Sequence, residues 1–168
     1  MEVARTPDQW VLPAPADHRL ASLVSYWDEK RAGRPMPNRS DIDPVDIPGL
    51  LPFLVLVELR EPPRRFYYRL TGTWVDELYG SCLTGLYLED LVETPGKAYW
   101  LEQYRRTAAL NAPTTGATGL DGLQQDYNHC EWVMLPLAAP QLPSGRMILV
   151  GLSFQVVTMP VMEAGGAG

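Results

Sequence analysis

The stretch FLVLVELREPPRRFYYRLT, residues 53–71, decides the fold class. Its first half is a short apolar run rich in valine and leucine, and its second half alternates between the two faces of an expected strand at 65–71. A Glu-Pro-Pro sequence at 61–63 separates the halves, and clustered prolines mark a turn. Two short β-rich runs on either side of a turn predict an antiparallel β-hairpin.

A helix is expected before this hairpin. Asp17 can cap its N terminus, and Gly33 and Pro35 end it. Its apolar residues share one face at helical spacing: Leu20, Leu23, Val24 and Trp27. Two interpretations stay open, because this face can pack on the domain's own core, or it can dock on a protein partner or on a second copy.

Short helical turns, a longer helix and three strands are expected after the hairpin. The turns are expected between residues 72 and 92, the helix at 96–110, and the strands at 114–120, 130–138 and 146–157. This order cannot form a doubly wound parallel sheet, which alternates strand and helix throughout. We therefore predict an α+β fold: a five-stranded antiparallel sheet with helices over one face and an extra N-terminal helix.

A single domain is expected at residues 17–159, because 168 residues suit one hydrophobic core. Residues 1–16 contain three prolines without a sustained apolar period, and the chain ends in alanine and glycine. We expect flexible segments at 1–16 and 160–168.

Composition excludes several classes of function. A net charge of −6 disfavours a nucleic-acid partner, which a basic surface would bind. The longest apolar run, at 50–57, is far shorter than the roughly 20 residues of a membrane span, and the N terminus lacks a signal peptide's apolar region. Only Cys82 and Cys130 occur, so no disulfide framework is indicated. We expect a cytoplasmic protein without membrane insertion.

Two motifs add a family resemblance. The sequence YWDEKRAGRPMPNRSDIDP, residues 26–44, leads into the first expected strand, and YRLTGT, residues 68–73, lies in and after the second. With the stretches 23–59, 66–91 and 131–138 around them, they resemble a family of small, largely uncharacterised bacterial stand-alone PAS proteins. Ser81 and Cys82 depart from the basic-acidic pair expected after Gly80.

The resemblance implies a PAS fold, in which helices across the concave face of the sheet enclose a pocket. It implies a sensory or interaction module in signal transduction and not an enzyme, with a protein partner or a homodimer. It does not imply one ligand. Two alternatives remain: a ligand-free adaptor that dimerises through its N-terminal helix, and a small enzyme with an acid pair, such as Glu77 with Glu89 or Asp90.

No cofactor is identified. The sequence argues against haem, because His18 and His129 lie outside the long helix that carries the ligand in haem-binding PAS domains. It argues against flavin, because Cys82 lacks the residues that flank the reactive cysteine of light-sensing PAS domains; a buried cysteine is expected there. Asp41, Asp43 and Asp46 lack the glycine and glutamate of a calcium loop, so capping and pairing with arginines are expected.

What remains is an apolar pocket for a small ligand, with walls from alternating strand residues and the long helix. The candidate wall residues are Phe66, Tyr68, Leu70, Trp100, Tyr104, Trp132, Met134, Val150, Leu152 and, further along the last strand, Phe154. The sequence does not decide whether Trp132 and Met134 or the opposite set beginning at Val133 face inward. Tyr68 and Trp132 are favoured, because each combines an apolar body with a hydrogen-bonding tip.

Overall fold

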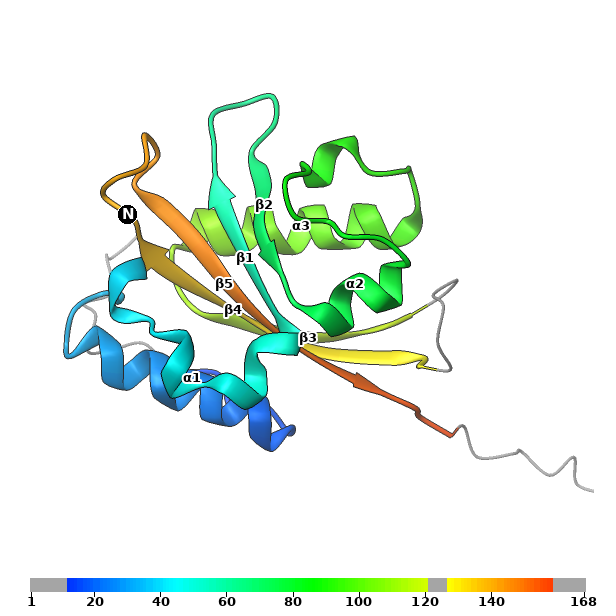
Figure 1. Cartoon of the computed structure of the whole chain (residues 1–168), viewed down its shortest axis with the longest axis horizontal. Helices are drawn as coiled ribbons and strands as arrows, with labels where there is room; N and C mark the ends of the chain where they lie inside the picture. The colour runs from blue at the N-terminus through cyan, green and yellow to red at the C-terminus, as the bar shows by residue number, and fades with distance from the viewer. Residues whose placement is uncertain (1–11, 121–126, 159–168) are drawn as a thin grey trace, which may run out of the picture.

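The computed structural model of the chain describes residues 12–120 and 127–158. A five-stranded antiparallel sheet with strand order β2-β1-β5-β4-β3 lies between two helical layers (Figure 1). The strands are β1 (Leu54–Leu59), β2 (Phe66–Thr71), β3 (Thr114–Gly119), β4 (His129–Ala138) and β5 (Arg146–Gln155). The helices are α1 (His18–Arg31), α2 (Thr73–Tyr79) and α3 (Pro95–Leu110), with short 3-10 helices η2 (Arg39–Asp41), η3 (Pro44–Asp46), η4 (Pro48–Phe53) and η5 (Leu88–Asp90). The predicted fold class is confirmed.

The predicted flexible segments at 1–16 and 160–168 fall mostly on residues 1–11 and 159–168, which lie outside the described part of the chain. Residues 12–16 are described, and Leu12 packs partly against the core beside α1. No helix of the described residues is both long and apolar enough to span a membrane.

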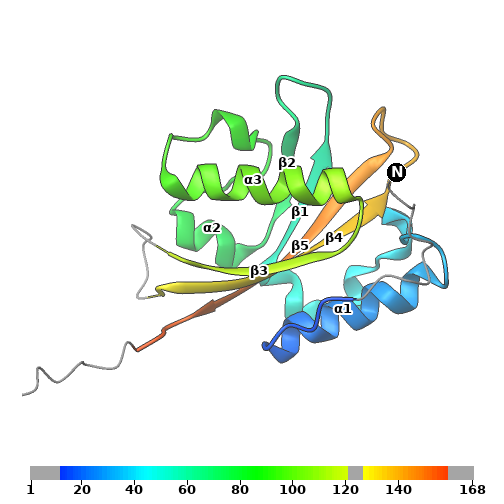
Figure 2. The same cartoon turned by 180° about the vertical axis from the view of Figure 1, so that it is seen from behind.

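Helix α1 covers one face of the sheet, and α2, η5 and α3 cover the other (Figure 2). Each strand sends alternate residues to the two faces, as its pleat requires. Val133 and Leu149 point towards α1, whereas Trp132 and Val150 point towards α3. Both faces of the central strands are therefore buried in apolar surroundings.

The apolar face of α1 is packed on the chain's own sheet. Its four residues Leu20, Leu23, Val24 and Trp27 are at most 4% exposed. The Trp27 indole nitrogen donates a hydrogen bond to the Pro136 carbonyl at 2.8 Å. Of the two interpretations of this face, the structure shows packing on the domain's own core, and these buried side chains leave no room there for a second molecule.

Gly151 in β5 sets how closely α1 approaches. A Cβ atom at this position would lie 2.6 Å from Leu23 Cδ2, closer than carbon atoms pack, and 3.0 Å from Leu20 Cδ2, which is tighter than most such contacts. The missing side chain therefore makes the groove into which the helix fits.

The segment between α1 and β1 is ordered by its carboxylates. Asp43 caps η3 by accepting from the Val45 amide, as expected, and Asp41 pairs with Arg34 at 2.7 Å. Asp46 instead accepts from the Tyr26 hydroxyl and pairs with Lys30. The expected pairing with Arg39 is wrong, because that guanidinium donates to a backbone carbonyl. No cluster of three metal-ligating side chains occurs in the described ranges.

A β-bulge changes which residues of β2 face inward. Val57 pairs with Tyr68 and Leu56 pairs with Leu70, so Arg69 is the extra residue between them. The bulge reverses the alternation after Tyr68. Leu70 therefore turns away from the expected pocket and is 48% exposed.

Candidate ligand pocket

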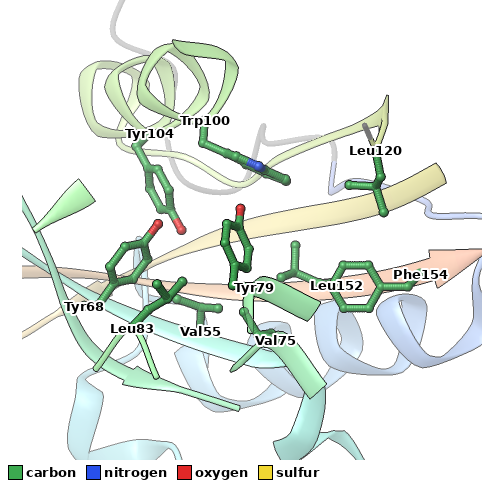
Figure 3. Close-up of a pocket in the computed structure, with 10 residues that line it drawn as sticks. All are labelled: Val55, Tyr68, Val75, Tyr79, Leu83, Trp100, Tyr104, Leu120, Leu152 and Phe154. Atoms are coloured by element: carbon green, nitrogen blue, oxygen red, sulfur yellow. The ribbon is translucent and has the colours of Figure 1, made fainter. Parts of the chain in front are cut away.

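A cavity lies between α2, α3 and the inner face of the sheet (Figure 3). Protein atoms leave about 430 Å³ empty there, part of it open to solvent. The wall consists of Val55, Tyr68, Val75, Tyr79, Leu83, Trp100, Tyr104, Leu120, Leu152 and Phe154. Pockets for small molecules combine apolar walls with a few polar groups in this way.

Tyr68 from β2 and Tyr104 from α3 supply the polar groups at one end. Both residues are buried, at 6% and 3% exposure, and their hydroxyls point towards each other and the cavity (Figure 3). Within the described residues, neither hydroxyl makes a hydrogen bond. Burial raises the pKa of both phenols well above the ordinary value, so they stay protonated at neutral pH.

Tyr79 brings a third hydroxyl into the cavity from the last turn of α2. The residue is 40% exposed, but its hydroxyl points inward towards the Trp100 indole (Figure 3). Burial raises the pKa of this hydroxyl, and the Trp100 interaction opposes that shift. The three phenols are therefore neutral groups that can donate or accept hydrogen bonds.

Aromatic side chains fix the side of the cavity near β3 and β4. The Trp132 indole nitrogen donates to the Tyr99 hydroxyl at 2.9 Å, and Trp100 packs edge-on against Trp132 with ring centroids 5.9 Å apart. Gly116 in β3 makes space for the Trp132 ring, because a Cβ atom there would lie 2.6 Å from Trp132 Cζ2. Trp132 thus supports the wall residue Trp100 from behind.

Side chain to backbone hydrogen bonds hold the segments that close the cavity. The Asp76 carboxylate accepts from the Thr71 hydroxyl and the Leu83 amide, which fixes α2 against the end of β2. The buried Lys97 ammonium donates to the carbonyls of Glu89 and Leu91 at 2.8 Å and to the Glu93 carboxylate. These contacts place η5 and α3 without filling the cavity.

Five of the ten candidate wall residues line the cavity: Tyr68, Trp100, Tyr104, Leu152 and Phe154. Four others belong to the same buried cluster without reaching the cavity: Phe66, Trp132, Met134 and Val150. Phe66 packs on the Tyr104 ring at 5.4 Å, so it positions a wall residue. Leu70 faces the other side of the sheet, because the bulge at Arg69 reverses the alternation of β2.

Five wall residues were not expected from the sequence: Val55, Val75, Tyr79, Leu83 and Leu120. Period-two alternation in β1 is the signal that would have found Val55. Val75 and Tyr79 are four residues apart, which places them on one face of α2. Leu83 follows the Gly80 that ends α2, and its position depends on the Asp76 contact, which no local pattern indicates.

The β5 wall is linked to α1 through the opposite face of the same strand. Leu152 and Phe154 face the cavity, while Ser153 between them donates to the Asp17 carboxylate at 2.7 Å. Asp17 caps α1 by accepting from the Arg19 amide at 2.8 Å. Burial opposes its ionisation, but the hydrogen bonds from Ser153 and Arg19 prevail and lower its pKa to about 2.

The carboxylates considered as an acid pair do not meet at the cavity. Glu89 accepts from the backbone amides of Arg65 and Phe66, and Asp90 pairs with Arg64 at 3.2 Å. Glu77 is exposed. No carboxylate is among the described wall residues.

The histidines and cysteines also lie away from the cavity wall. His18 is exposed at the start of α1, and His129 is half-buried at the start of β4. The expectation of a buried Cys82 is wrong, because the turn after α2 exposes it. Cys130 is buried instead, and burial raises the pKa of its thiol to about 12.

Comparison with known proteins identifies the family. A search of curated proteins finds no match. A family model described as a PAS domain matches residues 16–149, which include α1, the first four strands and part of β5. PAS domains are in general sensory or interaction modules. With the sheet order and the position of the cavity already described, this match shows that the chain belongs to the PAS domain family.

Proposed function

We propose that this chain is a sensory module that binds a small apolar or amphipathic ligand in the cavity and passes the bound state to a protein partner. The observation that carries the proposal is the cavity, into which the hydroxyls of the buried residues Tyr68 and Tyr104 point. A core that serves packing alone fills such space and pairs its polar groups. Membership of the PAS family supports a sensory or interaction role.

The proposal includes no chemical step. The described wall offers apolar surface and protonated phenols, which bind and orient a ligand. A cytoplasmic location also belongs to the proposal, in agreement with two cysteines that are both free thiols.

Ligand binding can be tested by blocking the cavity. Leu152→Trp enlarges a side chain of the cavity wall. The control Leu70→Trp makes the same change in side-chain volume at an exposed position of β2. A library of small uncharged fragments is screened by NMR against both variants and the unmodified protein. We expect fragments that bind the unmodified protein and Leu70→Trp but not Leu152→Trp. Equal binding to Leu152→Trp, or no binding to any form, would refute the proposal.

The route to a partner is proposed to run through β5. A ligand that moves Leu152 or Phe154 also moves Ser153, whose hydroxyl holds the α1 cap. The receiver, in this proposal, is a protein that contacts α1 or the segment before it.

Hydrogen exchange tests this route. Binding of a fragment is expected to change the exchange rates of the first-turn amides of α1, and Ser153→Ala is expected to remove most of that change. The same measurement without the fragment is the reference for each protein. An unchanged α1 response in Ser153→Ala would show that the link does not run through this residue.

A further inference from the structure

The polar groups of the cavity restrict the chemistry of its ligand. Tyr68 and Tyr104 are each more than nine-tenths buried, come from different elements and direct their hydroxyls to the same region of the cavity (Figure 3). The two hydroxyls border the cavity and make no hydrogen bond within the described residues, so a ligand there can pair with them. The ligand therefore needs at least one hydrogen-bonding group at this end.

The lack of charged side chains in the described wall further restricts the class of ligand. The described wall contains no lysine, arginine, histidine, aspartate or glutamate. An ionised ligand would lose its hydration there and gain no opposite charge. Because the phenols are neutral, an uncharged oxygen on the ligand is the group that suits them.

The shape and polarity of the cavity wall restrict the rest of the ligand. Apart from the phenols and the Trp100 indole, the wall is made of valine, leucine and phenylalanine side chains. The space of about 430 Å³ includes a part that is open to solvent, so only a compact group fits in the enclosed part.

We infer that the cavity takes an uncharged small molecule with a compact apolar body and one hydroxyl or carbonyl oxygen, which hydrogen-bonds to the hydroxyls of Tyr68 and Tyr104. The inference rests on the proposed function and makes these two tyrosines the residues that determine ligand selectivity. Alcohols, phenols and ketones share the required chemistry, whereas carboxylates and hydrocarbons each lack part of it.

Three probes of similar size represent the three ligand classes: phenol has an uncharged oxygen, toluene is a hydrocarbon and benzoate is a carboxylate. Dissociation constants at pH 7 come from NMR titrations of the ¹⁵N-labelled full chain, and the amide shifts report where each probe binds. The variant is Tyr68→Phe with Tyr104→Phe, which removes two oxygens and keeps both rings. The control is Tyr67→Phe, whose ring packs on Arg60 and Tyr87 outside the cavity wall.

Benzoate is expected to bind at least about tenfold more weakly than phenol to the unmodified protein, because its charge has no partner in the wall. In the double variant, the phenol dissociation constant is expected to rise about fivefold to tenfold, which corresponds to the loss of one hydrogen bond. The toluene constant is expected to change less than about twofold, and Tyr67→Phe is expected to leave both constants unchanged. Each single variant gives the same comparison if the double variant does not fold.

Benzoate binding as tight as phenol binding would overturn the inferred class, and so would a phenol constant that does not change in the double variant. Either result leaves the proposed function intact, because a ligand still enters the cavity. Failure of all three probes to shift any wall amide would count against both the inference and the proposed function.

Discussion

The two faces of the sheet are built from the same strands and differ in the space they leave, which is about 430 Å³ on the α3 face and about 210 Å³ beside Gly151 on the α1 face. On the α1 face, the side chains of Leu23 and Trp27 are at most 1% exposed, and the polar groups that point there are paired: the Trp27 indole with Pro136, and Ser153 with Asp17. On the α3 face, the Tyr68 and Tyr104 hydroxyls point into a cavity without a described partner.

This difference indicates that the two faces of the sheet have different roles in the domain. The α1 face supplies packing and fixes the position of the N-terminal helix. The α3 face gives up part of its packing to keep a binding space. Substitutions on the two faces should therefore have different effects on stability and on ligand binding.

The largest effect is expected from Trp27→Ala. Truncation of a fully buried tryptophan costs about 3–5 kcal/mol, and it also leaves the Pro136 carbonyl without its donor. Trp100→Ala, in the half-buried wall of the cavity, should cost less than about half as much. Urea unfolding of both variants measures the free energies of unfolding. A larger loss in Trp100→Ala would reverse the assignment of the two faces.

Gly151→Ala tests how tightly α1 is packed. The new Cβ atom would lie 2.6 Å from Leu23 Cδ2, and overpacking of this kind costs about 1–3 kcal/mol. Gly49→Ala is the matched control, because nothing lies within 4 Å of its Cβ position, and its effect should stay within about 0.5 kcal/mol. Thermal unfolding of the pair checks the prediction; equal melting temperatures would mean that the groove is not filled.

Acid should weaken the attachment of α1. The pKa of Asp17 is about 2 in the folded protein against an ordinary value of 3.8, so folding favours its ionised form. Its contribution, about 2 kcal/mol, is complete above about pH 4 and is lost as the pH falls towards 2. Asp17→Asn keeps a capping side chain but cannot ionise, so the stability difference between the two proteins should shrink over this range. A difference that is constant with pH would contradict the assignment.

The smallest effect is expected from the tyrosines. Tyr68→Phe and Tyr104→Phe remove hydroxyls without described partners, so the free energy of unfolding should stay unchanged or rise by up to about 1 kcal/mol. Ser153→Ala on the other face should lower it by about 1–2 kcal/mol, because it removes a hydrogen bond to the charged Asp17. Urea unfolding compares the three variants. A marked loss in both tyrosine variants would show that their hydroxyls are paired in solution.

Local sequence patterns are sufficient for the elements of this fold. The β-hairpin at 53–71 was expected within one residue of β1 and β2, because alternation and the prolines between the strands are local signals. The helix at 96–110 was expected within one residue of α3, because helical spacing and helix end signals are also local. Local patterns also find Tyr68 and Tyr104, whose strand and helix positions are regular.

Contacts between distant segments determine which strand residues face the cavity and where α2 lies, and local sequence patterns do not show these contacts. Both faces of β4 are apolar, because α1 covers the face that a simpler sheet would expose to water, so alternation could not show whether Trp132 or Val133 faces the cavity. The bulge at Arg69, which turns Leu70 outward, has no local signal. The place of α2 depends on Gly72, which lies against the Pro52 carbonyl so closely that a Cβ atom would be 2.3 Å from the oxygen.

A crystal structure of the protein in complex with phenol would show directly whether the cavity binds a ligand. We expect one phenol molecule between α2, α3 and the sheet, with its oxygen about 3 Å from the hydroxyl of Tyr68 or Tyr104. The α1 face should remain packed as it is here. An empty cavity at saturating phenol, or phenol bound only on the α1 side of the sheet, would refute ligand binding in this cavity.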